Sequence, residues 1–117
     1  MDIDYELLKK TAEQYILETE LYINDALSLS INEPLIVTTN RVKIFKKENI
    51  KCFFTFVSIS QFDVDKYNIQ NPYGYIKSIK NSRLYTYLGE LYNNLFYTVM
   101  YVYVIDFNKH KKENDHE

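Results

Sequence analysis

The chain is poor in the residues from which several common functional sites are built. Its 117 residues include two glycines, two prolines, one cysteine and no tryptophan. A glycine-rich phosphate loop or a nucleophile elbow needs more glycine than Gly74 and Gly89 supply. Cys52 has no second cysteine to pair with, which excludes an internal disulfide and favours a reducing, cytoplasmic setting. Its place inside a predicted strand indicates a buried, inert thiol.

Histidine is missing from the body of the chain. His110 and His116 both lie in the polar C-terminal stretch 109–117, so the usual general base is absent from the expected domain. Two histidines in a solvated stretch also make poor metal ligands, because nothing orients their rings. Asp63 and Asp65 share a loop, but an oxygen-ligand metal site normally collects more carboxylates than these two. We therefore expect no enzyme activity, no metal and no cofactor.

The sequence also lacks the segments that would place it in a membrane or a secretory pathway. No apolar run reaches the ~20 residues of a spanning helix, and the start MDIDYELLKK is acidic where a secretory signal is basic. Abundant Ile, Asn, Lys and Tyr match AT-rich codons, which weakens any argument from the twelve tyrosines alone. This composition is common in low-GC bacteria, their phages and some large viruses, and we expect a cytoplasmic accessory protein of a phage, virus or other mobile element.

Charge is unevenly distributed, although the net charge is only −2. Residues 1–33 carry eight acidic side chains against two basic ones, and residues 34–117 carry twelve basic against eight acidic. Spacing by seven predicts a solvated acidic helix face made of Glu6, Glu13 and Glu20. A basic hairpin is predicted from Arg41, Lys43, Lys46, Lys47 and Lys51. Such a patch suits phosphates, yet lysine also protects strand edges, and the sequence pI near 5.7 is low for a nucleic-acid binder.

The first part of the chain predicts one long helix followed by a hairpin. Apolar residues at three- and four-residue spacing indicate a helix over 4–22, with a possible short second helix ending near Leu29. Strands are predicted over 35–45 and 50–60, with a polar turn between them. A loop that can hold one helical turn around residues 64–67 is expected over 61–73.

The segment after Pro72 allows two interpretations. Strands over 75–80 and 83–92, each followed by an Asn-containing tight turn, are the favoured interpretation. In the second of them, Tyr85, Thr86 and Tyr87 favour a strand and Gly89 weakens a helix. Leucines at helical spacing make a helix over 82–95 the competing interpretation.

The last apolar segment, 95–107, has two apolar side-chain rows at once. A strand of this kind must be covered on both faces, and the sequence predicts only one helical layer to cover it. We expect the second face to bind a partner or to enclose a pocket. Tyrosine is enriched at interfaces, so the candidate partner-binding residues are Tyr97, Tyr101 and Tyr103 on this strand, with Tyr85 and Tyr87 beside them.

These patterns predict an α+β domain over residues 1–108, followed by a polar tail over 109–117. An amphipathic N-terminal helix should pack on a twisted antiparallel sheet of four or five strands. The expected function is non-enzymatic protein binding, as a homodimer and plausible inhibitor of a host or defence protein, with no membrane association. Two alternatives stay open: nucleic-acid binding through the basic hairpin, and small-ligand binding between helix and curved sheet. The second would resemble nuclear-transport-factor-like and cystatin-like folds in layout, without any shared motif.

Overall fold

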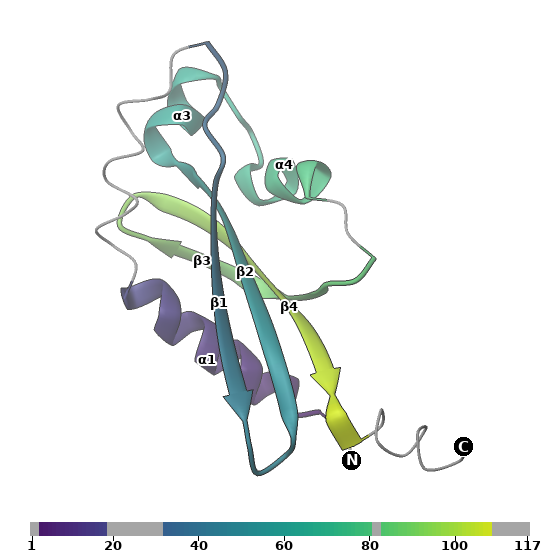
Figure 1. Cartoon of the computed structure of the whole chain (residues 1–117). Helices are drawn as coiled ribbons and strands as arrows, with labels where there is room; N and C mark the ends of the chain where they lie inside the picture. Colours follow the sequence, from purple (N-terminus) through teal and green to yellow (C-terminus); the bar gives the residue numbers. More distant parts are fainter. Residues whose placement is uncertain (1–2, 19–31, 81–82, 109–117) are drawn as a thin grey trace.

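The fold is an α+β arrangement of helices packed on a four-stranded antiparallel sheet, as predicted (Figure 1). The computed structural model describes residues 3–18, 32–80 and 83–108. The elements are α1 (Tyr5–Glu18), β1 (Val37–Phe45), β2 (Ile50–Ser60), α3 (Gln61–Lys66), α4 (Pro72–Ile79), β3 (Thr86–Asn93) and β4 (Phe96–Asp106).

The sheet has the order β1-β2-β4-β3, with every neighbouring pair antiparallel. Its centre is the pair of eleven-residue strands β2 and β4, which are in register from Ile50↔Asp106 to Ser60↔Phe96. Both strands are dense in aromatic and β-branched residues, which suit a pleated, buried surface. The predicted strands 35–45, 50–60 and 95–107 are confirmed, with ends that differ by no more than two residues.

Helix α1 covers one face of this sheet. Its residues Leu8, Ala12 and Ile16 are at most 2% exposed and pack against Phe54 and Met100, among others. The side chain of Asp4 accepts a hydrogen bond from the Leu7 amide (3.2 Å), which satisfies a free donor of the first turn. The predicted helix is confirmed as far as its described residues go. Residues 19–22, the possible second helix and the tail 109–117 lie outside the described residues.

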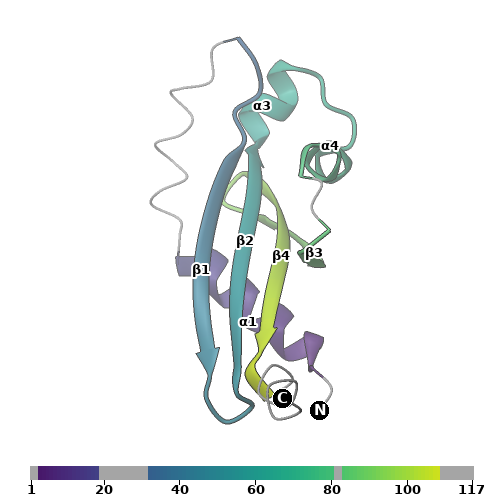
Figure 2. The ribbon, with the colours of Figure 1, turned by 45° about the vertical axis from the view of Figure 1, so that its right-hand side comes forward.

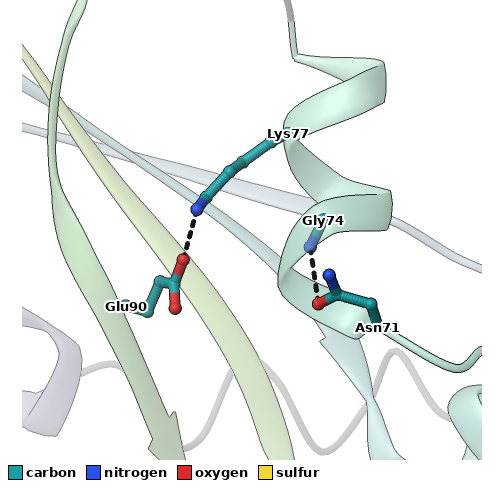
Figure 3. Close-up of polar contacts among 4 residues, drawn as sticks. All are labelled: Asn71, Gly74, Lys77 and Glu90. Atoms are coloured by element: carbon teal, nitrogen blue, oxygen red, sulfur yellow. Dashed lines mark hydrogen bonds and ion pairs between the residues drawn. The ribbon is translucent and has the colours of Figure 1, made fainter.

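The prediction of a strand over 75–80 is wrong, because residues 75–79 belong to α4 and Lys80 is its C-cap. The Asn71 side chain accepts a hydrogen bond from the Gly74 amide (3.1 Å, Figure 3), and Pro72 occupies the first turn. Asn at the N-cap followed by Pro is a helix-start signal. That signal outweighs the β-preference of the tyrosines, because the helix can bury Ile76 completely.

The segment predicted as a loop over 61–73 contains α3 and the start of α4. Ser60 caps α3 by accepting from the Asp63 amide (3.0 Å). The carboxylate of Asp63, which is 1% exposed, accepts from the Leu35 amide (2.9 Å) and so ties this short helix to the chain entering β1.

The strand interpretation of residues 83–92 is confirmed by β3, so the competing helix over 82–95 is wrong. The turn into β4 lies at Asn94 and Leu95, both at positive φ (48° and 65°), one residue later than predicted. Positive φ at both turn residues matches the twist of a two-residue hairpin. A bulge lies between Tyr87 and Gly89, whose φ of 156° favours glycine.

The expectation of a single helical layer is also wrong. Helices α3 and α4 pack on the sheet face opposite α1, where Val64 and Ile76 contact the row that contains Val57, Ile59 and Val99. Figures 1 and 2 show both short helices at the end of the sheet remote from the β1–β2 turn. This second layer therefore covers only part of its face.

Candidate protein-binding surface

The face opposite α1 divides into a covered half and an open half. The covered half lies under α3 and α4 and contains Val57, Ile59, Tyr97, Val99 and Tyr101. The open half lies nearer the β1–β2 turn and contains Val42, Ile44, Phe53, Tyr103 and Ile105. In the open half Val42 and Ile44 are 51% and 55% exposed, and the other three are half-buried.

The open half is continuous across three strands because of the sheet register. Val42 is opposite Phe53, and Phe53 is opposite Tyr103. The rings of Phe53 and Tyr103 have centroids 6.2 Å apart, and Tyr85 extends this row with its centroid 5.9 Å from that of Tyr103. A second row runs through Ile44, Lys51 and Ile105. The result is an apolar surface with aromatic rings near its centre.

Two cations lie within or beside this surface. The ammonium of Lys51 lies 5.2 Å from the centroid of Phe53, and that of Lys80 lies 5.1 Å from the centroid of Tyr85. An ammonium at such distances interacts favourably with the electron-rich face of the ring. The open half therefore combines apolar contact area with the positive charge of Lys51 inside it and of Lys80 beside it.

The five tyrosines predicted as partner-binding residues do lie together on this face. Tyr87 contacts Tyr101 with centroids 6.3 Å apart, and Tyr85 contacts Tyr103. They divide between the two halves, however. Tyr101 is 8% exposed and the Tyr97 hydroxyl donates to Gln61 (2.6 Å), so these two support the covered half. Tyr103 lies in the open half. Tyr85 lies between the two halves, because it packs against the covered cluster and also contacts Tyr103, and Tyr87 is 47% exposed beside Tyr101.

An ion pair fixes α4 over the covered half. Lys77 of α4 contacts Glu90 of β3 (Figure 3), and its ammonium lies 4.6 Å from the Tyr87 ring centroid. The hydrogen bond between them raises the pKa of Lys77 and lowers the pKa of Glu90. Burial raises the pKa of Tyr101, which lies close by. Tyr101 is therefore a neutral packing group of this half.

The sequence missed Val42 and Ile44, which are the most exposed apolar residues of the open half. Their alternation with Arg41 and Lys43 correctly indicates a strand with an apolar side. An apolar side is normally a buried side, and no pattern within 35–45 shows that α3 and α4 end before reaching this part of the sheet.

The basic hairpin exists, but its cations do not share one surface. Arg41 and Lys43 lie on the α1 side of the sheet, Lys51 lies on the open half, and Lys46 and Lys47 occupy the turn. A nucleic-acid backbone would have to contact two faces and a tip at once. The acidic helix face is represented by Glu6, which is exposed, and Glu13, which is half-buried. Glu20 lies outside the described residues.

The other candidate reactive groups, Cys52, Asp63 and Asp65, are engaged in burial or in hydrogen bonds within the domain. Cys52 is fully buried, and its burial raises the pKa of the thiol to about 11. Asp63 accepts from a backbone amide and Asp65 from the Gln61 side chain (2.9 Å). Within the described ranges, no group of three or more His, Cys, Asp or Glu side chains is placed to hold a metal ion.

A small pocket opens between the start of α1 and the β1–β2 turn. Its volume is about 230 Å³, below the roughly 300–1,000 Å³ of most ligand sites. Apolar side chains such as Leu7 and Ile50 form part of the lining, and Asp4, Glu48 and Asp106 also line it. This pocket is therefore not the expected deep apolar cavity. A second hollow of about 420 Å³ lies between α1 and the end of β1; it is more open to solvent, and Lys10, Gln14 and Lys43 are among its lining residues.

Comparison of this chain with known proteins identifies no family, so a function can be argued only from the geometry of the structure. No protein-family model, no curated protein and no solved structure matches this chain. Among the described residues, no helix has both the length and the apolar character that crossing a membrane requires.

Proposed function

We propose that this chain is a non-enzymatic protein-binding module that holds its partner on the open half of the sheet. The observation that carries the proposal is the exposure of Val42 and Ile44, at 51% and 55%, beside half-buried aromatic rings. Exposed apolar patches on a folded domain mark interaction sites. Full burial of an aliphatic side chain contributes about 1.5–3 kcal/mol. Val42 and Ile44 are already partly buried, so a partner that covers them gains a fraction of this free energy for each residue.

The chemistry of the surface supports binding rather than catalysis. The open half offers aliphatic groups, aromatic rings and the ammonium of Lys51. The abundance of residues with AT-rich codons supports an accessory protein of a phage, a virus or another mobile element. The unpaired Cys52 supports a cytoplasmic location. Inhibition of a host or defence protein is the form of binding that we propose for this setting.

A double variant tests the proposal with little change to the fold. Val42→Thr with Ile44→Thr keeps the branched shape that strands prefer but places hydroxyls on the surface. A hydroxyl buried without a hydrogen bond costs about 1–3 kcal/mol, so binding should weaken roughly tenfold or more. Phe62→Gln is the matched control, because Phe62 is 55% exposed on α3, outside the open half.

The measurement has two arms. Light scattering of the purified full chain tests self-association, which the sequence predicts as a homodimer. Affinity capture from source-cell extract, followed by binding to the purified captured protein, tests a different partner. The proposal expects a complex formed by the unchanged chain and the Phe62→Gln control but lost in the double variant. A complex that all three form equally, or a chain that is monomeric and captures nothing, would contradict it.

A further inference from the structure

Strand β1 presents an outer edge that no described strand pairs with. It is the terminal strand in the order β1-β2-β4-β3, and its other edge pairs with β2 in unbroken register from Val37↔Ser58 to Phe45↔Ile50. Its nine residues contain no proline and no bulge. Natural edge strands are usually protected by proline, by bulges or by charged side chains, because unpaired N–H and C=O groups form a template for another strand. In β1 the protective charges are those of Arg41 and Lys43.

The side chains of β1 specify what kind of strand would fit beside it. Val42 and Ile44 lie on the open-half side of the sheet, and Arg41 and Lys43 lie on the α1 side. A strand paired with β1 would alternate in the same way. Apolar side chains would extend the open half, and acidic side chains on its other side would lie beside the two cations.

Charge argues against a second copy of β1 as that strand. The sequence VTTNRVKIF contains two cations and no carboxylate. Pairing with itself would therefore bring four cations and no anion into one strand pair, and like charges on adjacent strands are destabilising. A partner strand with acidic side chains would instead place opposite charges beside Arg41 and Lys43, and this interaction is attractive. A nucleic-acid strand would also suit the cations, but it would leave Val42 and Ile44 without apolar contact.

We propose that β1 receives an extended, acidic segment of a partner protein by strand addition. Carboxylates of that segment lie beside Arg41 and Lys43, and its alternate apolar residues lie beside Val42 and Ile44. This inference rests on the proposed function and names the chemistry of the partner.

The test uses the full chain labelled with ¹⁵N and a capped peptide of alternating Glu and Val, as long as β1. Titration should shift the amide signals of Val37–Phe45 and slow hydrogen exchange at alternate amides of this strand. Two N-methylated peptides provide the geometric control. Methylating the amides on one edge of the peptide should abolish binding, and methylating those on the other edge should not, because only one edge pairs with β1.

Charge exchange provides the second control. Arg41→Glu with Lys43→Glu should weaken the Glu/Val peptide by roughly two- to thirtyfold, and should create binding of the matching Lys/Val peptide. Lys46→Glu with Lys47→Glu makes the same change of net charge in the turn, outside β1. It should change peptide affinity by less than about threefold, because exposed charges at a distance are screened by salt.

The outcomes separate this inference from the proposed function. Three results would overturn strand addition. The two N-methylated peptides would lose binding equally, the β1 amides would not respond to the peptide, or oligothymidylate would bind more strongly than the peptide. Self-association that disappears with Arg41→Glu and Lys43→Glu would also overturn it, in favour of a second copy. If the peptide fails while Val42→Thr with Ile44→Thr still abolishes the complex with the captured protein, the proposed function stands without strand addition.

Discussion

The two halves of one sheet face solve the same packing problem in different ways. In the covered half, the β2 and β4 residues lie under α3 and α4, and the side chain of Ile76 from α4 is fully buried among them. In the open half, β2 and β4 continue with Phe53, Tyr103 and Ile105, which are half-buried. Beside them on the edge strand β1, Val42 and Ile44 are more than half exposed. Apolar character along a strand therefore does not reveal whether its cover is internal or comes from a partner. The extent of the second helical layer, α3 and α4, determines which strand residues the chain itself covers.

The largest effect is expected where the covered half is held together. Ile76→Ala removes a fully buried side chain from α4 and should lower the free energy of unfolding by about 2–5 kcal/mol. The matched change in the open half, Ile44→Ala, should cost less than about 1 kcal/mol, since that side chain is already in water. Urea unfolding followed by circular dichroism measures both. Equal losses would mean that Ile44 is buried in solution.

A pair of tyrosines sharpens the comparison within β4. Tyr101→Ala should cost about 2–4 kcal/mol because its ring is 8% exposed beneath α4. Tyr103→Ala should cost roughly half as much, since its ring is half-buried. Tyr103→Ala should also weaken partner binding while the circular dichroism spectrum stays native. A stable Tyr101→Ala variant would show that α4 does not cover this residue.

The ion pair between α4 and β3 gives a smaller, pH-dependent effect. Glu90→Gln should cost about 0.2–1 kcal/mol, because the Lys77 side chain is 43% exposed and its attraction is screened by water. The pKa of Glu90 is lowered in the folded state by its hydrogen bond to Lys77. Its contribution is therefore present above the pKa of an unfolded glutamate and lost as the pH falls through the folded value.

Lys77 reverses the sign of that dependence. Its pKa is raised by the hydrogen bond to Glu90, so its contribution is present below the pKa of an unfolded lysine and lost as the pH rises through the folded value. The stability difference between the unchanged chain and Glu90→Gln should therefore be largest near neutral pH and shrink at both extremes. A difference independent of pH would exclude the ion pair as its source.

The smallest stability effect belongs to the surface proposed for binding. Val42→Thr with Ile44→Thr should change the free energy of unfolding by no more than about 0.5 kcal/mol for each residue. The same variant should lose the partner. A large drop in stability would instead place both residues in the packed core.

Much of the fold could be predicted from the sequence because its signals are local. The amphipathic spacing of α1, the β-branched and aromatic runs of β2 and β4, and the polar turn between β1 and β2 each specify one structure. The strand predicted over 75–80 leaves out the Asn71–Pro72 helix-start signal, which is also local and therefore readable from the sequence.

The candidate surface could be predicted only in part. Two apolar rows in β4 correctly indicate that both sheet faces need a cover. Which residues of those rows stay accessible depends on where α4 lies over the sheet, and this is set by tertiary contacts such as Lys77 with Glu90. For that reason the sequence predicts Tyr97 and Tyr101, which lie in the covered half, and does not single out the exposed Val42 and Ile44.

Thiol reactivity compares the two halves most directly, because the one native cysteine, Cys52, is buried with its pKa raised to about 11. Ile44→Cys reports on the open half, Val57→Cys on the covered half, and Phe62→Cys on an exposed site of α3. For the monomeric chain we predict that the thiols at positions 44 and 62 react at similar rates, whereas the thiol at 57 reacts only as fast as the protein opens. A thiol at position 44 that is as protected as the one at 57, at concentrations where the chain is monomeric, would contradict the claim that the open half awaits a partner.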